Sequence, residues 1–308
     1  DVDYGWVIRY MHTTGASLFF AVVYLHMFRG LLYGSYQKPK ELVWIFGCTI
    51  YLAMMAEGFL GYVLPYGQMS YWGAQVIISL FGSIPYIGES LELWVRGDYY
   101  ISGITVSRFF ALHVVALPLV LIALVFLHLV ALHEVGAGNP EGVDIEKYLD
   151  DDGIPLDSVP FFPYKVLNAL VAIGVFMTVF SIIMFFFPEG GGYFIEMANF
   201  QEANPLVTPD HIAPVWYYAP FYTMLRAIPD PFGGLIVMAS AVAIFFVVPW
   251  LDRSKVASIR YKGIYSKIAP PPGPLPMCKG VGNHAVGVFS SAPPEYRVTH
   301  IWPDSYTH

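Results

Sequence analysis

The chain has 308 residues, of which 56% are hydrophobic, 17% aromatic and only 13% charged. A soluble domain carries about a quarter of charged residues, so this composition indicates a protein whose main solvent is lipid. The net charge of -7 excludes the basic surface that binds nucleic acid. Cys48 and Cys278 are too few for a disulfide framework, and neither belongs to a C-x-x-C-H sequence for covalent haem attachment.

Five stretches are apolar over the ~20 residues that a helix needs to cross a membrane. They are residues 8–33, 42–64, 108–132, 166–188 and 233–251, here the first to fifth spans. Residues 70–95 are apolar but interrupted by Gly, Pro and Glu, which predicts short helices at the membrane interface. Residues 214–227 predict another short helix, and the acidic, turn-rich residues 137–163 predict a loop. The predicted fold class is all-α and integral to the membrane.

The basic residues divide unequally between the two sides of the membrane when the spans alternate in direction. One side collects Arg29, Lys38, Lys40, Lys147, Lys165, Arg253, Lys255, Arg260, Lys262 and Lys267. The other side has only Arg9, Arg96, Arg108 and Arg226. By the positive-inside rule, the first side is cytoplasmic.

Two histidines lie in the first span and two in the third. His12 and His26 are 14 residues apart, and His113 and His128 are 15 apart. In an α-helix, 14 residues rise ~21 Å and return to within about 40° of the starting face. A distortion at Pro118 would absorb the additional residue of the third span. Because these spans run in the same direction, the histidines predict two bis-histidine haem sites, His12 with His113 near the outer face and His26 with His128 nearer the cytoplasm.

The second span carries Gly47 and Gly61, which are also 14 residues apart. This span is antiparallel to the first, so Gly61 is level with the outer histidines and Gly47 with the inner ones. A glycine lets a flat macrocycle approach the helix backbone. Arg9 and Arg29, each three residues from a histidine, are candidate partners of haem propionates. Snorkelling to the membrane interface explains the two arginines equally well.

Polar and aromatic side chains gather on the outer side. Tyr62, Tyr217 and Tyr222 provide aromatic walls with hydroxyl donors, which suit an apolar ring with polar carbonyls such as a quinone. Glu57 lies within the second span, four residues before Gly61 and on the same helix face. An ionisable group inside a span is usually functional, so Glu57 is a candidate acceptor of a quinol proton. A protonated glutamic acid bonded to a neighbouring helix is the alternative explanation.

Five segments, in chain order, resemble the cytochrome b family of respiratory complex III. They are GWVIRYMHTTGASLFFAVVYLHMFRGLLYGSY, GYVLPYGQMSYWGA, RFFALH, HEVGAGNPEGV and PDHIAPVWYYAPFYTMLRAIPD. The resemblance covers residues 1–268 and implies a transmembrane bundle that binds two haems b without covalent bonds. It implies that His12 and His113 ligate the low-potential haem, and that His26 and His128 ligate the high-potential haem.

The same resemblance implies the activity of a quinol–cytochrome c oxidoreductase core subunit that is coupled to proton translocation. A ubiquinol-type quinol would be oxidised beside the outer haem, with one electron passing to a Rieske iron–sulfur protein. The other electron would cross both haems to a quinone near the cytoplasmic face. The implied setting is a homodimeric complex with a cytochrome c1-type subunit, in a bacterial inner membrane.

The family pattern adds residues to both quinone sites and divides the chain. Gly73 and Pro214 join the outer site, where Tyr217 also takes part in catalysis, and His133 matches a quinone ligand of the inner site. The expected division is residues 1–135 for the dihaem bundle, 136–165 for a cytoplasmic loop, 166–268 for a C-terminal membrane part, and 269–308 for a tail without an assigned role.

The sequence departs from the family pattern in three respects. Many members read PEWY where this chain reads PVWY, so Val215 replaces the glutamate thought to take a quinol proton. The acidic partner expected at the inner site near residues 164–168 is absent, since the chain reads PYKVLN there. The family also has a helix before the first span and further spans after the fifth, and we expect these to belong to a longer chain.

Two other functions remain open at this stage. The dihaem anchor of a dehydrogenase would explain the histidines with a single quinone site, but not the PVWY segment on the outer side. A proton-coupled transporter could use the histidines and Glu57 as a proton relay. Such a transporter would bind no haem and usually shows inverted repeats, which are not evident in this sequence.

Overall fold

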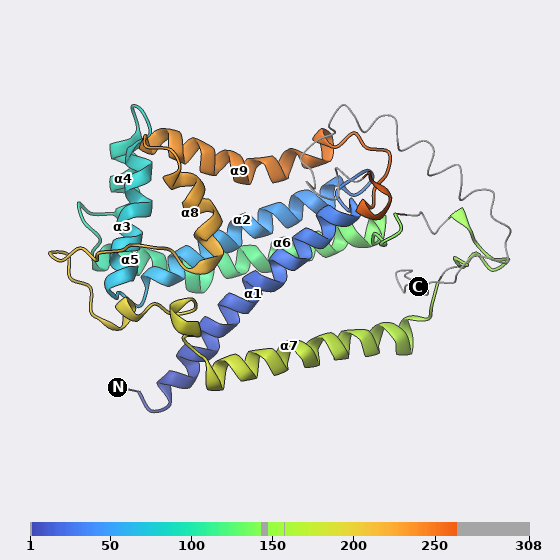
Figure 1. Ribbon diagram of the computed structural model, residues 1–308, viewed down its shortest axis with the longest axis horizontal. Coiled ribbons are helices and arrows are strands. Elements are labelled where there is room, and N and C mark those ends of the chain that lie inside the picture. Colours follow the sequence, from blue (N-terminus) through green and yellow to red (C-terminus); the bar gives the residue numbers. More distant parts are fainter. Residues whose placement is uncertain (1, 143–146, 157, 264–308) are drawn as a thin grey trace. The chain divides into compact units, whose positions relative to one another are not determined.

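The computed structural model describes residues 2–142, 147–156 and 158–263 (Figure 1). In these ranges five helices are long and apolar enough to cross a membrane. They are Gly5–Tyr33 (α1), Glu41–Val63 (α2), Gly103–Val135 (α5, a π-helical turn and α6), Phe161–Phe186 (a π-helical turn and α7) and Pro231–Leu251 (α9). The five predicted spans and the all-α fold are confirmed. Lys267 and the predicted tail, residues 269–308, lie outside the described residues.

The third long helix begins earlier than predicted. Helix α5 spans Gly103–Ala111, whereas the apolar pattern suggested a start at Arg108. The reason is a capping box: the Ser102 hydroxyl accepts from the Ile104 N–H at 3.3 Å, and the Thr105 hydroxyl accepts from the Ser102 N–H at 3.2 Å. These bonds satisfy N–H groups that the first turn leaves without partners.

A wide turn interrupts this helix at one of the predicted ligands. Leu112–Ala116 is π-helical and includes His113, and α6 follows over Leu117–Val135. Pro118 has no N–H to close an α-helical bond, and the bond just before it runs from the Leu117 N–H back to the Leu112 carbonyl. A π turn holds about one residue more than an α turn. The distortion predicted near Pro118 is therefore present, and it accommodates the additional residue of the third span.

Short helices connect the long ones. Helices α3 (Gln68–Gly82) and α4 (Gly88–Arg96) are the short helices predicted within residues 70–95, and they pack against each other. The short helix predicted within residues 214–227 is a 3-10 turn, Trp216–Tyr218, that continues into α8, Ala219–Arg226.

Helix α3 also holds the long segment between α7 and α9. The Gln68 side chain donates to the Val207 carbonyl at 2.5 Å and accepts from the Asn204 N–H at 2.7 Å. The Asn199 side chain accepts from the Ser70 N–H at 2.8 Å and donates to the Ser70 hydroxyl at 2.9 Å. Because Gln68, Ser70 and Asn199 are buried, these bonds are shielded from water and fix the course of the segment.

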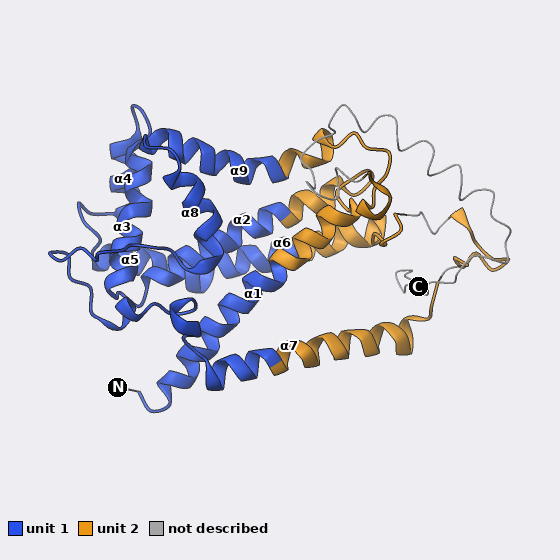
Figure 2. Cartoon of the chain, viewed as in Figure 1, with its two compact units in different colours: residues 1–23, 48–125, 179–245 blue, residues 24–47, 126–178, 246–308 orange. Residues whose placement is uncertain are grey.

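The chain forms two compact units (Figure 2). Unit 1 consists of Asp1–Val23, Cys48–Val125 and Val179–Phe245, and it contains His12 and His113. Unit 2 consists of Tyr24–Gly47, Phe126–Thr178 and Phe246–His308, and it contains His26 and His128. The core of unit 1 is formed by Leu60, Val63, Tyr71, Ala74, Ile78, Ile101 and Phe109. The functional division of the chain made from the sequence stays a prediction.

A buried carboxylate organises one end of unit 2. Asp252 accepts from the Tyr36 hydroxyl at 2.6 Å, from the Gln37 amide at 3.0 Å and from the Ser254 N–H at 2.9 Å, and it pairs with the Lys262 ammonium at 3.0 Å. Burial alone would raise the pKa of Asp252, but the hydrogen bonds and the ammonium outweigh it and hold the pKa below its usual value. The carboxylate therefore ties the chain after α9 to the α1–α2 connection.

We predict that Asp252→Asn destabilises the folded protein by ~3–5 kcal/mol, because it leaves the Lys262 ammonium buried without a counter-ion. The measurement is the thermal unfolding midpoint of the detergent-solubilised protein, with the exposed Asp151→Asn as the matched control.

The pH dependence follows from the lowered pKa of Asp252. A carboxylate of this kind contributes its full stability above the pKa of the unfolded state, ~3.9, and loses it as the pH falls through the lower folded-state pKa. The difference between the wild type and Asp252→Asn should therefore shrink at acid pH. A difference that persists undiminished there would contradict this account.

Candidate functional site

The two outer histidines face each other in unit 1. The centres of the His12 and His113 rings are 6.1 Å apart, and the ring planes are at 88°. A metal ion held by two imidazole nitrogens at ~2 Å places the ring centres ~6 Å apart. The two side chains, one from α1 and one from the π turn, therefore have the spacing of axial ligands of a single metal centre.

A backbone carbonyl fixes the tautomer of His113. Its Nδ1 lies 2.9 Å from the Glu57 carbonyl oxygen. Because a carbonyl oxygen only accepts, Nδ1 carries the hydrogen and Nε2 keeps the lone pair that a metal needs. Metal-bound histidines are commonly oriented in this way, through the N–H that does not face the metal. A carboxylate oxygen of Glu57 also lies 2.9 Å from Nδ1, so this carboxylate contacts the candidate ligand.

The predicted glycine on α2 is what allows this contact. A Cβ at Gly61 would lie 2.4 Å from Cε1 and 2.8 Å from Nδ1 of His113, closer than real Cβ atoms approach. Any side chain at this position would therefore displace the imidazole from the Glu57 carbonyl.

Unit 2 repeats the arrangement with the inner residues. The His26 and His128 ring centres are 6.3 Å apart, with planes at 76°, and a Cβ at Gly47 would lie 3.3 Å from Cε1 of His128. His133 lies in the last turn of α6, and Arg29 stands over the Tyr33 ring at 5.9 Å. The structure thus brings together the predicted inner histidines and glycine.

Both histidine pairs fit a haem. The porphyrin supplies four iron ligands, so the protein needs to provide only two axial ones and a flat surface beside them. His12, His113 and Gly61 meet this need in unit 1, as do His26, His128 and Gly47 in unit 2. Within the described part of the chain, no group of three or more His, Cys, Asp or Glu side chains could hold a metal ion alone.

An apolar cavity of about 310 Å³ lies in unit 1. Its walls come from α2, α3, residues 212–215, α8 and α9, and they include four predicted quinone-site residues: Tyr62, Gly73, Pro214 and Tyr222. Val215 lines it too and is buried, so the PVWY segment presents an apolar side chain there. Ligand pockets for small apolar molecules have volumes of ~300–1,000 Å³. The cavity therefore has a suitable size and surface for a quinone ring.

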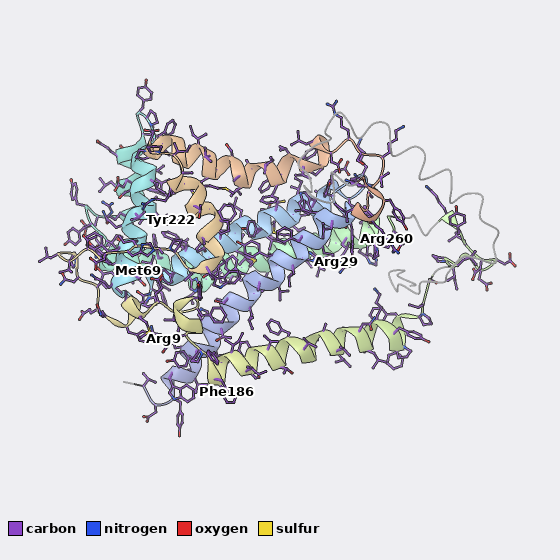
Figure 3. All side chains as sticks on the ribbon, viewed as in Figure 1. Arg9, Arg29, Met69, Phe186, Tyr222 and Arg260 are labelled. Atoms are coloured by element: carbon purple, nitrogen blue, oxygen red, sulfur yellow. The ribbon has the colours of Figure 1, made fainter. Side chains whose placement is uncertain are left out.

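Three tyrosine hydroxyls belong to the walls of this cavity. Tyr218 donates to the Met55 carbonyl at 2.7 Å, and Tyr222, labelled on α8 in Figure 3, donates to the Ile212 carbonyl at 2.9 Å. The Tyr62 hydroxyl is buried, and no described residue forms a hydrogen bond with it. Tyr62 is therefore the tyrosine of the cavity wall whose hydroxyl has no hydrogen-bond partner among the described residues.

Some predicted residues lie elsewhere. Tyr217 is buried and stacks on Phe20, with ring centres 3.9 Å apart, and it does not line the cavity. Glu57 does not line the cavity either. Arg9, labelled in Figure 3, stands over the Phe200 ring at 4.7 Å. The roles predicted for these residues stay predictions.

The sequence reasoning missed the part that Tyr218 and Gly58 play. A Cβ at Gly58 would lie 2.5 Å from the Tyr218 hydroxyl, so this glycine makes room for the tyrosine to reach the Met55 carbonyl. The available signal was a third glycine in α2, three residues before Gly61.

Comparison with known proteins agrees with this geometry. Residues 1–136 match the family model of cytochrome b/b6/petB, and residues 202–270 match that of cytochrome b(C-terminal)/b6/petD. A solved structure, "Hyperthermophilic respiratory Complex III", superposes with a TM-score of 0.78 at 36% identity, covering 94% of this chain and 78% of that one. The chain belongs to the cytochrome b family.

Relatives within the family are close. Cytochrome b of Allochromatium vinosum is 58% identical over 271 residues, which cover 85% of this chain and 65% of that protein. Cytochrome b of Rickettsia bellii is 49% identical over 265 residues, which cover 86% of this chain and 64% of that protein. The chain therefore spans just under two thirds of the length of these relatives. With five membrane-spanning helices, it is a multi-pass membrane protein.

We predict that Gly61→Val abolishes binding of the outer haem and leaves the inner haem in place, because the side chain would occupy the position of the His113 ring. Haem content and the low-temperature optical spectrum measure the result. Gly103→Val is the matched control, since a Cβ at Gly103 meets nothing within 4 Å. Retention of both haems in Gly61→Val would show that α2 does not support the outer site.

Proposed function

We propose that this cytochrome b carries electrons across the membrane, from a quinol oxidised at the outer cavity to a quinone reduced near the cytoplasmic face, coupled to proton translocation. It would do so as the core subunit of a quinol–cytochrome c oxidoreductase in a bacterial inner membrane. The observation that carries the proposal is the pair of facing histidines, His12 and His113, in the same unit as an apolar cavity with one uncommitted hydroxyl.

Two haems b are the proposed cofactors, held by His12 and His113 and by His26 and His128. When bound, they supply one-electron redox chemistry. The protein's own part is to fix the imidazoles: the Glu57 carbonyl orients His113, and Gly61 and Gly47 leave the adjoining helix surface bare. Arg9 and Arg29 are proposed to face the propionates.

The outer cavity is the proposed site of quinol oxidation. Its apolar walls would exclude water from the ring, and the Tyr62 hydroxyl would form a hydrogen bond with a quinol oxygen. Gly73, Pro214 and Tyr222 line the same cavity and would set its shape. Tyr217, stacked on Phe20, keeps its proposed part in quinol binding and catalysis.

The proposed partners follow from the family. They are a Rieske iron–sulfur protein as the acceptor of one electron, a cytochrome c1-type subunit, and a second copy of the complex. His133 is proposed to bind a quinone at the inner site, on the side rich in basic residues.

A reduced-minus-oxidised optical spectrum tests the proposal against its alternatives. Two b-type components that quinol reduces would support the proposed function. A dehydrogenase anchor would give haem signals without quinol oxidation at the outer cavity. A trace without haem absorbance would leave the transporter and exclude the proposed function.

We predict that His26→Ala or His128→Ala removes the inner haem alone, because the two rings are spaced as ligands of one metal centre. The outer haem should stay reducible by quinol. The measurement is the optical spectrum of each variant in isolated membranes. If the two variants lost different haems, the assignment of the pair would be wrong.

We predict that Gly73→Val raises the KM for quinol by about 10-fold or more, since added methyl groups would fill the cavity that Gly73 lines. Haem content should not change. Gly103→Val again provides a control for the same substitution outside the cavity. An unchanged KM in Gly73→Val would place the quinol elsewhere.

A further inference from the structure

The cavity lacks an obvious acceptor for the protons of a quinol. None of its lining residues carries a carboxylate or an imidazole, and Val215 stands where many family members have a glutamate. Oxidation of a quinol releases two protons, and a dry site cannot pass them directly to water. A proton must therefore reach its acceptor through one of the hydroxyl groups of the cavity wall.

The Tyr62 hydroxyl is the one polar group of the wall that can pass a proton onward. Tyr218 and Tyr222 already donate to backbone carbonyls, whereas the buried Tyr62 hydroxyl has no hydrogen-bond partner among the described residues. The charges of Glu196 and of Tyr217 both act on this hydroxyl. Glu196 is thus a carboxylate whose charge acts on the Tyr62 hydroxyl, but the two groups form no hydrogen bond with each other, so the Glu196 side chain has to turn toward the hydroxyl before a proton can pass.

A buried chain of hydrogen bonds holds Glu196 in this neighbourhood. The Ser70 hydroxyl donates to the Tyr62 carbonyl at 2.5 Å and accepts from the Asn199 side chain at 2.9 Å. The Asn199 N–H in turn donates to the Glu196 carbonyl at 3.0 Å, at the start of the 3-10 turn Met197–Phe200. Residue 196 is therefore linked to residue 62 through two side chains of unit 1.

The state of Glu196 suits a proton acceptor. Its Oε2 is buried, and no hydrogen bond to it forms within the described residues. Burial raises the pKa of Glu196 from its ordinary value, and the charge of His211 opposes this rise in part. A general base works best when its pKa lies near the working pH, so a carboxyl with a raised pKa is well matched to this task. His211 directly precedes Ile212, a residue of the cavity wall.

We infer that Glu196 takes up one of the two protons of the quinol, through the hydroxyl of Tyr62. The quinol O–H bond breaks as its proton goes to the Tyr62 oxygen, and the Tyr62 proton goes to the Glu196 carboxylate, which becomes a neutral carboxylic acid. The two electrons and the other proton would be taken by the one-electron acceptors of the proposed function, an external iron–sulfur protein and the haem that His12 and His113 would hold. This inference rests on the proposed quinol-oxidising function.

The decisive variant is Glu196→Gln, which keeps the shape of the side chain and removes its ability to accept a proton. In the intact membrane complex with decylubiquinol as the probe, haem reduction through the outer cavity should slow by about 10²-fold or more. Tyr62→Phe should slow it similarly. In infrared difference spectra of quinol oxidation, the signal of a newly protonated carboxyl should be present in the wild type and absent from Glu196→Gln.

Two further variants sharpen the test. Glu202→Gln makes the same change at an exposed position of the same segment and should match the wild type. Val215→Glu places a carboxyl in the cavity wall, so it should restore part of the rate when combined with Glu196→Gln. Haem absorbance should be equal in all variants.

The outcomes separate this inference from the proposed function. A wild-type complex that decylubiquinol cannot reduce would refute the proposed function itself. A wild-type rate and an unchanged carboxyl signal in Glu196→Gln, with quinol oxidation intact, would refute only the role of Glu196. A loss of rate in Glu57→Gln but not in Glu196→Gln would assign the proton to Glu57 instead. Haem loss that parallels the loss of rate would mean that Glu196 only supports the fold.

Discussion

The contact between the His113 imidazole and the bare backbone of α2 is the interaction on which the rest of the outer site depends. The absence of a Cβ at Gly61 lets the ring reach the Glu57 carbonyl, and that bond sets both the orientation and the tautomer of the ring. The His113 and His12 ring centres then lie 6.1 Å apart, the spacing of two imidazoles that ligate one metal ion. The missing side chain at Gly61 on α2 thus determines which nitrogen of His113, on another helix, is free to bind a metal.

Helix α2 serves the metal-ligand site and the cavity at once. Its residues four positions apart, Glu57 and Gly61, face His113, while Met55 receives the Tyr218 hydroxyl and Tyr62 opens into the cavity. Because one rigid helix carries both surfaces, a shift of α2 would move the histidine support and the cavity wall together. In the proposed function, this sharing would couple the haem site closely to the quinol site.

The helical period made the histidines and the paired glycines predictable from the sequence, because residues 14 apart in a helix return to nearly the same face. The choice between adjacent tyrosines was not predictable: the 3-10 turn directs Tyr218 toward the cavity and Tyr217 onto Phe20. The position of Glu196 could not be predicted from the sequence for another reason. The segment that carries Glu196 is held by hydrogen bonds between Asn199 and Ser70, which are 129 residues apart.

The junction at Asp252 has a consequence for how the chain is made. Tyr36 and Asp252 are separated by 216 residues. The connection between α1 and α2 therefore cannot bond to Asp252 until the whole of α9 has left the ribosome. Until then, the Tyr36 hydroxyl lacks the Asp252 carboxylate as its hydrogen-bond acceptor. Closure of the junction is therefore a late event of biogenesis, and a chain that stalls before residue 252 would display an unfinished surface to the proteases that survey newly inserted membrane proteins.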